Sequence, residues 1–368
     1  MPKGIERLTC LRTLDCFIVC GGGENESKAA NLRELKNLDH IGGSLVIKNL
    51  RGGDIEDAAE AQLKNKKRLL CLELYFKHNN EDGNLIEVLQ PPSDLERLSI
   101  WWYGGIVLPN WMMALTRLQE LQLSDCENLE VLPPLGRLPN LESLELVRLG
   151  VRRLDAGFLG REEVENANNI NEGEITRVTA FPKLKRLGIK YLKELEEWDG
   201  IERRVGEEDA TTTSIFIVMR QLRELSIFDC PLLRALPDYV LAAPLQELYV
   251  SVCPNLSKRY GEEKGEDWHK ISHIPLVIFA ANGVVLATEK NLPSILVDES
   301  SVGESIKRKI QASYVNDPQM FQKLTYRYVD SNRAMDLTSF PKIITGRRPE
   351  NIQSSIIGMK WKRTVMIR

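Results

Sequence analysis

Cysteine and histidine side chains could bind a metal or act in catalysis, but in this chain neither type is spaced for that chemistry. Cys10, Cys16 and Cys20 are separated by five and three residues and have no histidine beside them, which does not fit the ligand spacing of a zinc site. The four histidines are scattered, and no Ser-His-Asp or Cys-His arrangement can be built from His40, His78, His269 and His273. We therefore expect no metal site and no enzyme active site.

The glycine and carboxylate clusters lead to the same conclusion. Gly21, Gly22 and Gly23 precede ENESK, whereas a phosphate-binding loop requires G-x-x-x-x-G-K-[ST], a pattern that the 368 residues do not contain. We expect a turn at these glycines, and neither a bound nucleotide nor any other cofactor. An acidic run, expected to be the solvated face of a loop, consists of Glu194, Glu196, Glu197 and Asp199.

Leucine residues, by contrast, recur at a fixed spacing. The segments LERLSI, LQELQL and LESLEL begin at Leu95, Leu118 and Leu141, which are 23 residues apart. Similar segments begin at Leu184 (LKRLGI), Leu222 (LRELSI) and Leu245 (LQELYV), and LCLEL lies upstream. A period in the twenties with leucine at positions 1, 4 and 6 indicates a leucine-rich-repeat solenoid. The longer spacings before LKRLGI and LRELSI contain polar insertions, which we expect to form loops on one side of the stack.

The repeat LQELQLSDCENLEVLPPLGRLPN shows the physical basis of the pattern. Leu121 and Leu123 alternate with polar residues, as in a strand with one buried face. Pro133, Pro134 and Gly136 exclude a long helix on the return side. Three residues after the last aliphatic residue of the strand, where a small buried residue fits the turn, the repeats carry Cys126, Cys230 and Cys253. Strands are expected near Leu14, Leu45, Leu72, Leu98, Leu121, Leu144, Leu187, Leu225 and Leu248.

The strand residues that point away from the core should line the concave face, through which solenoids bind their partners. In this register the candidate protein-binding residues are Arg97, Ser99, Trp101, Glu120, Gln122, Ser124, Ser143, Glu145, Arg186, Lys190, Glu224, Phe228, Glu247 and Tyr249. We expect most of them to be merely solvated. Trp101, Phe228 and Tyr249 are the strongest candidates, because aromatic residues are enriched at binding hot spots.

Several consecutive segments carry a family resemblance that covers about residues 1–275. They include MPKGIERLTCLRTLDCFIV, AANLRELKNLDHIGGSLVIKNL, DAAEAQLKNKKRLLCLELYF, LPNWMMALTRLQELQLSDCENLEVLPPLGRLPNLESLEL and CPNLSKRYGEEKGEDWHKISHIP. This part resembles the repeat domain of plant nucleotide-binding leucine-rich-repeat disease-resistance proteins of the coiled-coil class. In that family the domain recognises pathogen-derived or guarded host proteins and restrains an adjoining nucleotide-binding module.

The resemblance implies a protein-recognition module of the plant defence response that lacks its nucleotide-binding switch. Its expected partner is a protein: a pathogen effector, a guarded host protein or a nucleotide-binding module acting in trans. No small-molecule substrate is expected. The ligand, the pathogen recognised and the oligomeric state cannot be read from the sequence.

A second resemblance covers about residues 279–302. The segment AANGVVLATEKNLPSILVDESSV looks like part of a proteasome alpha subunit, closest to the alpha type-2 subunit, where it forms two strands and their turn. The residues themselves favour a hairpin, because IPLVIFAANGVVLATEK has two apolar runs around Ala-Asn-Gly. We expect a hairpin fragment at 276–302 that either leans on the last repeat near Tyr249 or stays unattached. This leaves two alternative hypotheses, a proteasome-related fragment or a non-functional chimeric product.

The C-terminal tail, 303–368, is basic and resembles nothing known to us. Residues 304–368 contain 13 Lys/Arg and 5 Asp/Glu, a net charge of +8, whereas the whole chain has −3. The basic residues are scattered rather than clustered, which argues against nucleic-acid binding. We expect a disordered or irregular tail.

The overall expectation is an α/β leucine-rich-repeat solenoid with a curved parallel sheet, an irregular return side, a small C-terminal hairpin and a poorly ordered tail. The domains are expected at 1–275, 276–302 and 303–368. Leu8, Leu11 and Leu14 should present an incompletely covered apolar edge. The sequence has no signal-peptide core and no apolar stretch long enough to span a bilayer. The expected location is the cytoplasm, with the nucleus as the alternative.

Overall fold

A computed structural model describes residues 4–19, 30–51, 55–77, 85–160, 177–199, 215–261, 265–281, 284–289, 325–330 and 333–336. The chain divides into two compact units, one made of Met1–Leu222 with Leu236–Ala243 and the other of Arg223–Ala235 with Pro244–Arg368. In both units the repeat strands pair in parallel with their neighbours. The fold class expected from the sequence, a leucine-rich-repeat solenoid, is therefore confirmed.

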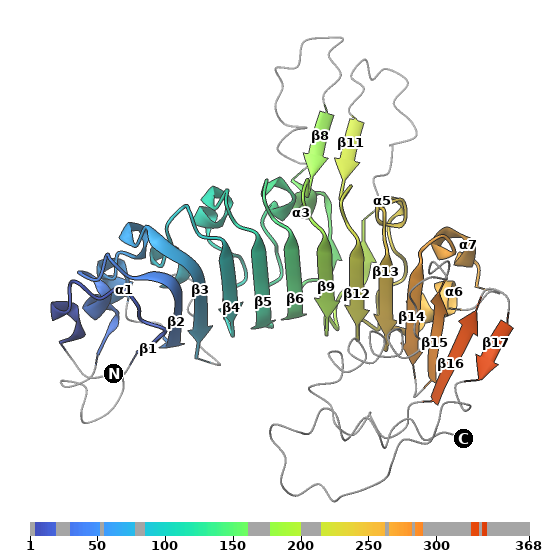
Figure 1. Cartoon of the computed structure of the whole chain (residues 1–368), viewed down its shortest axis with the longest axis horizontal. Coiled ribbons are helices and arrows are strands. Elements are labelled where there is room, and N and C mark those ends of the chain that lie inside the picture. The colour runs from blue at the N-terminus through green and yellow to red at the C-terminus, as the bar shows by residue number, and fades with distance from the viewer. Residues whose placement is uncertain are drawn as a thin grey trace, which may run out of the picture. The chain divides into compact units, whose positions relative to one another are not determined.

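The first unit is built on a parallel sheet whose strands follow the order of the sequence (Figure 1). Six of these strands contain the leucine expected at their centre: Leu45, Leu72, Leu98, Leu121, Leu144 and Leu187. The strand expected near Leu14 begins two residues later, at Cys16. The strands are β1 (Cys16–Ile18), β2 (Gly42–Leu50), β3 (Arg68–Phe76), β4 (Arg97–Trp101), β5 (Glu120–Cys126), β6 (Ser143–Leu149) and β9 (Arg186–Lys190).

Two rows of aliphatic side chains form the core beneath this sheet. Because the register pairs equivalent positions of successive repeats, each leucine of one strand lies beside the matching leucine of the next. Full burial of such a side chain contributes about 1.5–3 kcal/mol. All members are at most 2% exposed: Leu45, Leu72, Leu98, Leu121, Leu144 and Leu187 in one row, and Ile47, Leu74, Ile100, Leu123, Leu146 and Ile189 in the other.

Short helices return the chain between strands. Pro109, Pro134 and Pro237 directly precede three of them. The helices in the described part of this unit have at most six residues, so the return side described there is irregular, as expected. The α-helices are α1 (Ile55–Glu60), α2 (Leu85–Val88), α3 (Ala156–Leu159) and α5 (Asp238–Leu241). The 3-10 helices are η1 (Ile5–Arg7), η3 (Leu32–Leu35), η4 (Leu63–Asn65), η5 (Asn110–Ala114) and η6 (Leu135–Arg137).

Two small parallel sheets, which the sequence analysis did not anticipate, lie beside the long insertions of this unit. β8 (Arg177–Ala180) pairs with β11 (Ile215–Val218), and β7 (Arg153–Leu154) pairs with β10 (Glu197–Trp198). Most of both insertions lies outside the described residues. The described ends of the insertions nevertheless add strands rather than plain loops.

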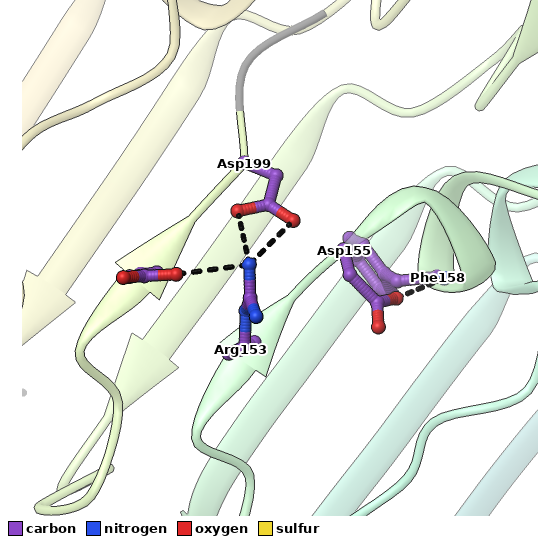
Figure 2. A network of polar contacts seen from close by, with 5 residues as sticks. Arg153, Asp155, Phe158 and Asp199 are labelled. Carbon is purple, nitrogen blue, oxygen red and sulfur yellow. Dashed lines mark hydrogen bonds and ion pairs between the residues drawn. The ribbon is translucent and has the colours of Figure 1, made fainter.

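The acidic run expected to be the solvated face of a loop lies partly in β10, and two of its members bind Arg153 (Figure 2). Arg153 Nη2 lies 3.0 Å from Glu197 Oε2 and 3.4 Å from Asp199 Oδ1, and Asp199, followed by Glu197, raises the pKa of Arg153. Nearby, Asp155 caps α3: its Oδ1 accepts a hydrogen bond from the Phe158 backbone N–H at 3.1 Å. The run is solvated as expected, since Glu194, Glu196 and Glu197 are exposed and Asp199 is half-buried. Glu197, however, lies in a strand rather than in a loop, and both Glu197 and Asp199 pair with Arg153.

The second unit has its own parallel ladder of β12 (Glu224–Phe228), β13 (Glu247–Ser251) and β14 (Leu276–Ala281). The strand β15 (Val284–Glu289) pairs antiparallel with β14, so the expected hairpin is present. It leans on the last repeat, with Tyr249 opposite Ile278. The pairing therefore continues across the boundary expected at residue 275. The helices of this unit are α6 (Pro254–Tyr260) and α7 (Trp268–Ile271).

Within 303–368, the structure describes the strands β16 (Thr325–Asp330) and β17 (Arg333–Asp336), which pair antiparallel with each other. β16 also pairs in parallel with β15. The other residues of 303–368, for which a disordered or irregular tail is expected, lie outside the described residues. Cys20, His78 and the glycines at 21–23 lie outside them as well.

Two further expectations concern cysteines and the N-terminal edge. Cys126, Cys230 and Cys253 are completely buried, as expected for the turn that leaves the strand. Leu8 is 56% exposed, and Leu11 and Leu14 are half-buried, so the apolar edge is incompletely covered, as expected. Among the helices that the structure describes, none is long and apolar enough to cross a membrane.

Candidate functional site

The outer face of the first unit is the side of β2–β6 and β9 opposite the leucine core. Alternation along each strand and the parallel register arrange its side chains in three rows that run across the sheet. Row one contains Ser44, Cys71, Arg97, Glu120, Ser143 and Arg186; row two contains Val46, Glu73, Ser99, Gln122, Glu145 and Gly188; row three contains Lys48, Tyr75, Trp101, Ser124, Val147 and Lys190. All ten candidate residues expected between Arg97 and Lys190 lie in these rows.

Rows one and two enclose a hollow of about 490 Å³ over β3–β6. Its lining is polar and charged, with two aliphatic residues of the strands beneath. The lining consists of Cys71, Glu73, Arg97, Leu98, Ser99, Glu120, Leu121, Gln122, Ser143 and Glu145. A hollow with charged walls on an open sheet suits contact with a side chain or a short segment of a partner.

An aromatic cluster of Tyr75, Trp101 and Trp102 borders the hollow at the carboxyl ends of β3 and β4. The rings of Tyr75 and Trp101 stack with centroids 5.4 Å apart and planes 4° apart. Trp102, which is 39% exposed, is tilted against both rings. Lys48 Nζ lies 5.2 Å from the Tyr75 ring centroid, in the geometry of a cation–π contact. The cluster thus offers exposed indole surface next to fixed charges.

The carboxylates of row two are held in place in different ways. The Tyr75 hydroxyl donates a hydrogen bond to Glu73 Oε2 at 3.0 Å, and burial, followed by this contact, raises the pKa of Tyr75 to about 12. Glu145 Oε1 pairs with Lys190 Nζ at 2.5 Å. Gly188 leaves room for this carboxylate, because a Cβ at residue 188 would lie 2.3 Å from Glu145 Oε2.

The residue that follows the row-three position adopts a left-handed conformation in five repeats of this unit. These residues are Asn49, Trp102, Asp125, Arg148 and Tyr191, with φ values of 66°, 56°, 58°, 50° and 57°. Arg148 Nη1 lies 3.0 Å from Asp125 Oδ1, and the Arg148 guanidinium carbon lies 5.0 Å from the Tyr191 ring centroid. We call these five residues the strand-exit row, in which Arg148 contacts both Asp125 and Tyr191 of the neighbouring repeats.

Three candidate residues are less accessible than the sequence suggested. Phe228 and Tyr249, on β12 and β13 of the second unit, are only 3% and 4% exposed, so the expectation that they are exposed aromatics is wrong. Their neighbours on the same side are Ser251 and Ile278. Ser124 has no exposed surface, because it lies beside Trp101 in row three and accepts a hydrogen bond from Gln122 at 3.1 Å. Glu224 and Glu247 are register partners in the second unit.

Lys48, Glu73, Tyr75 and Trp102 were missed by the sequence analysis. The alternation in LCLELYF was a usable signal, since it places Cys71, Glu73 and Tyr75 opposite the leucines of β3. Lys48 lies in a strand without the full leucine pattern, and Trp102 reaches the cluster only through its left-handed backbone. Among the described residues, no group of three or more His, Cys, Asp or Glu side chains could hold a metal ion.

Comparison with known proteins matches residues 32–149 to the family model described as R13L1/DRL21 LRRs. The putative disease resistance protein RGA1 of Solanum bulbocastanum is 35% identical over 63% of this chain and 21% of its own length. The disease resistance protein RGA2 of the same species is 34% identical over 61% of this chain and 22% of its own. This chain therefore carries a leucine-rich-repeat domain related to plant disease-resistance proteins, and it spans about a fifth of the length of these relatives.

Two further matches are more distant. The putative disease resistance RPP13-like protein 1 of Arabidopsis thaliana is 25% identical over 92% of this chain and 31% of its own length; an alignment of that extent takes in residues 279–302. The leucine-rich repeat domain of the type III effector XopL is 21% identical, covers 60% of this chain and 56% of its own, and has a TM-score of 0.32. The match to the RPP13-like protein supports the likeness to disease-resistance proteins, and it gives no support to the proteasome-like resemblance.

Proposed function

We propose that this chain is a non-catalytic protein-recognition module of plant defence that binds a protein partner through the outer face of its first unit. The observation that carries the proposal is the outer face itself, where a charged hollow and an exposed aromatic cluster stand on a leucine-rich-repeat sheet. The relationship to disease-resistance proteins supports the defence context.

The partner that we propose is a pathogen effector, a guarded host protein or a nucleotide-binding module that acts in trans. In this proposal the chain works without its own nucleotide switch, in the cytoplasm or the nucleus. Trp101 and the row-one and row-two residues over β3–β6 form the contact surface, because they combine indole surface, hydrogen-bonding groups and charge. In this proposal the chain itself binds no small-molecule substrate, metal or nucleic acid.

Site-specific photo-crosslinking in plant cells tests this function. A photoreactive amino acid at Gln122, on the outer face, should capture a protein, whereas the same group at the exposed Glu130, away from the sheet, should not. The captured protein, once purified, should bind the native chain and lose binding to a Trp101→Ala variant. Equal capture at Gln122 and Glu130, or binding unaffected by Trp101→Ala, would contradict the proposal.

The alternative is a proteasome-related role for residues 279–302, for which the hairpin of β14 and β15 is the relevant observation. It predicts that the tagged chain co-purifies with assembled proteasomes in stoichiometric amount. The pairing of β14 with β13 favours the repeat domain as the place of this hairpin instead. If no transcript spans codons 270 to 310, the proteasome-related role is ruled out and the tail is an artefact of the gene model.

A further inference from the structure

Glu73 is a half-buried carboxylate on the outer face, and no cation pairs with it among the described residues. The hydroxyl of Tyr75 holds it at 3.0 Å. The other acidic residue of row two, Glu145, is instead neutralised by Lys190 at 2.5 Å. A carboxylate that is fixed but not neutralised is a position where a partner's cation can form an ion pair without rearranging the receptor.

Aromatic surface lies directly beside this carboxylate. Tyr75 follows Glu73 by two residues on β3, and its ring stacks on Trp101 of β4. Lysine and arginine side chains have an apolar stem and a cationic head. Such a stem can pack on the indole surface of Trp101 and Trp102 while the head reaches Glu73, with a further cation–π contribution.

The other charges of the hollow favour the same kind of partner. Its lining contains the three carboxylates Glu73, Glu120 and Glu145 against one cation, Arg97. An acidic side chain placed there would meet these carboxylates in a partly desolvated site, and like charges brought together in an interface cost several kcal/mol. Charge complementarity therefore selects a basic side chain.

The dimensions of the hollow indicate how much of a partner it holds. Its lining residues come from β3, β4, β5 and β6. Four neighbouring strands about 4.8 Å apart span about 14 Å, which corresponds to about four residues of extended chain at about 3.3 Å per residue. The floor between the acidic ends of row two is formed by the neutral residues Ser99 and Gln122, which can hydrogen-bond to a peptide backbone.

We propose that the hollow binds an extended segment of a protein partner, and that one lysine or arginine of this segment pairs with Glu73 beside the aromatic cluster. This inference rests on the proposed function, because it specifies the chemistry of the partner that the outer face recognises.

Selection of random heptapeptides on the purified full-length chain tests the inference. The native chain should enrich peptides that contain lysine or arginine. Replacing that basic residue by norleucine in a selected, labelled peptide should weaken binding at least about tenfold in fluorescence anisotropy, equivalent to about 1.4 kcal/mol. Higher salt should weaken the native complex as well.

Matched variants assign the effect to the hollow. Glu73→Gln should abolish the enrichment of basic peptides, while Glu130→Gln, an equal charge change on the exposed return side, should preserve it. Tyr75→Phe, which removes the hydrogen bond to Glu73 and keeps the ring, should weaken binding less than Glu73→Gln does. Circular dichroism verifies that each variant is folded.

Three outcomes would overturn the inference: no enrichment, enrichment of acidic or uncharged peptides, and basic peptides whose binding survives Glu73→Gln. None of these affects crosslinking of a protein at Gln122. A loss of that crosslinking preference would overturn the proposed function instead, so the two failures can be told apart.

Discussion

Lys66 is a charged residue of the first unit with no exposed surface. Its ammonium group donates a hydrogen bond to the Leu35 carbonyl at 2.7 Å and lies 3.5 Å from Asp39 Oδ1. Desolvation lowers the pKa of Lys66 from its usual 10.5, and the Asp39 carboxylate opposes that shift without cancelling it. The protonated form is therefore less favourable in the folded state than in the unfolded one.

This pKa shift predicts a pH dependence of stability. Between the lowered pKa of the folded state and 10.5, the unfolded chain binds more protons at residue 66, so the folded state gains stability as the pH rises. A Lys66→Met variant lacks this contribution. The free energy of unfolding of the native chain minus that of Lys66→Met should increase as the pH rises from 7 towards 10.5. The rise is complete only above pH 10.5, where it amounts to about 1.4 kcal/mol for each unit by which the pKa is lowered.

Urea unfolding of both chains at several pH values provides the measurement. The comparison with the variant removes the effect of other titrating groups, such as Tyr75 and Tyr103, whose pKa values are raised to about 12. A difference that stays constant or decreases with pH would contradict the prediction.

Gly188 gives a second prediction at the scale of one residue. In Gly188→Ala, the new methyl group should push the Glu145 carboxylate away from Lys190, because the Cβ would lie 2.3 Å from Glu145 Oε2. The displaced group is the end of a flexible side chain, so the fold should remain as stable as before, or up to about 1 kcal/mol more stable, since alanine suits a strand better than glycine.

Acetylation of lysines followed by mass spectrometry checks this change. Lys190 should react faster in Gly188→Ala than in the native chain. Lys185, which pairs with Glu142 at 2.8 Å, serves as the internal control and should react at an unchanged rate. An unchanged rate at Lys190 would show that the ion pair with Glu145 survives the methyl group.

At the scale of the element, the repeat strand offers a matched pair of substitutions. Leu121 and Gln122 are neighbours on β5, but Leu121 is 1% exposed in the core and Gln122 points to the outer face. Leu121→Asp should destabilise the first unit by several kcal/mol, because it buries an unpaired charge. Gln122→Asp should destabilise the unit much less than Leu121→Asp, because the outer face is open to water, even though the change removes the hydrogen bond to Ser124 and adds a carboxylate beside Glu145.

Thermal melting of the two variants measures this contrast. Equal melting temperatures of the two variants would contradict the assignment of Leu121 to the buried face and Gln122 to the outer face. The test also examines the register, because a shift by one residue would exchange the roles of Leu121 and Gln122.

The repeat strands could be predicted from sequence because their chemistry is local and periodic. Leucines at positions 1, 4 and 6 place β4, β5 and β6 without any knowledge of distant contacts. The strands β7 and β10 could not be predicted, because two residues are too short for a pattern and their pairing depends on repeats 44 positions apart (197 − 153). The accessibility of Phe228 and Tyr249 likewise depends on neighbours such as Ile278 that belong to a strand without the leucine pattern.

At the scale of the whole molecule, β14 extends the parallel ladder of the second unit by one strand beyond the last leucine-rich repeat. The next strand, β15, pairs antiparallel with it. β14 begins 29 residues after β13 (276 − 247) and lacks the leucine pattern. The boundary expected at 275, where the first family resemblance ends, lies directly before it. Val277, Ile278 and Phe279 are nevertheless at most 4% exposed. The burial of β14 makes it a structural continuation of the repeats.

Truncation tests this role directly. A chain that ends at residue 275 should be less soluble and should melt at a lower temperature than a chain that ends at 290, because it exposes the edge of β13 and forgoes the burial of three side chains worth about 1.5–3 kcal/mol each. Dynamic light scattering and thermal melting of the two products provide the comparison. Equal behaviour would place β14 outside the cooperative structure.

The 23-residue interval between β4, β5 and β6 also bears on how such a surface can diversify. Leu98, Leu121 and Leu144 are the same residue at the same position of three successive strands, as are the segments' first leucines at 95, 118 and 141. Duplicating or deleting one interval would therefore present unchanged leucine contacts to both flanking strands. The outer face, however, would gain or lose the three side chains that one strand contributes to rows one, two and three. Recombination between repeats could therefore change several binding residues at once while the leucine core stays the same.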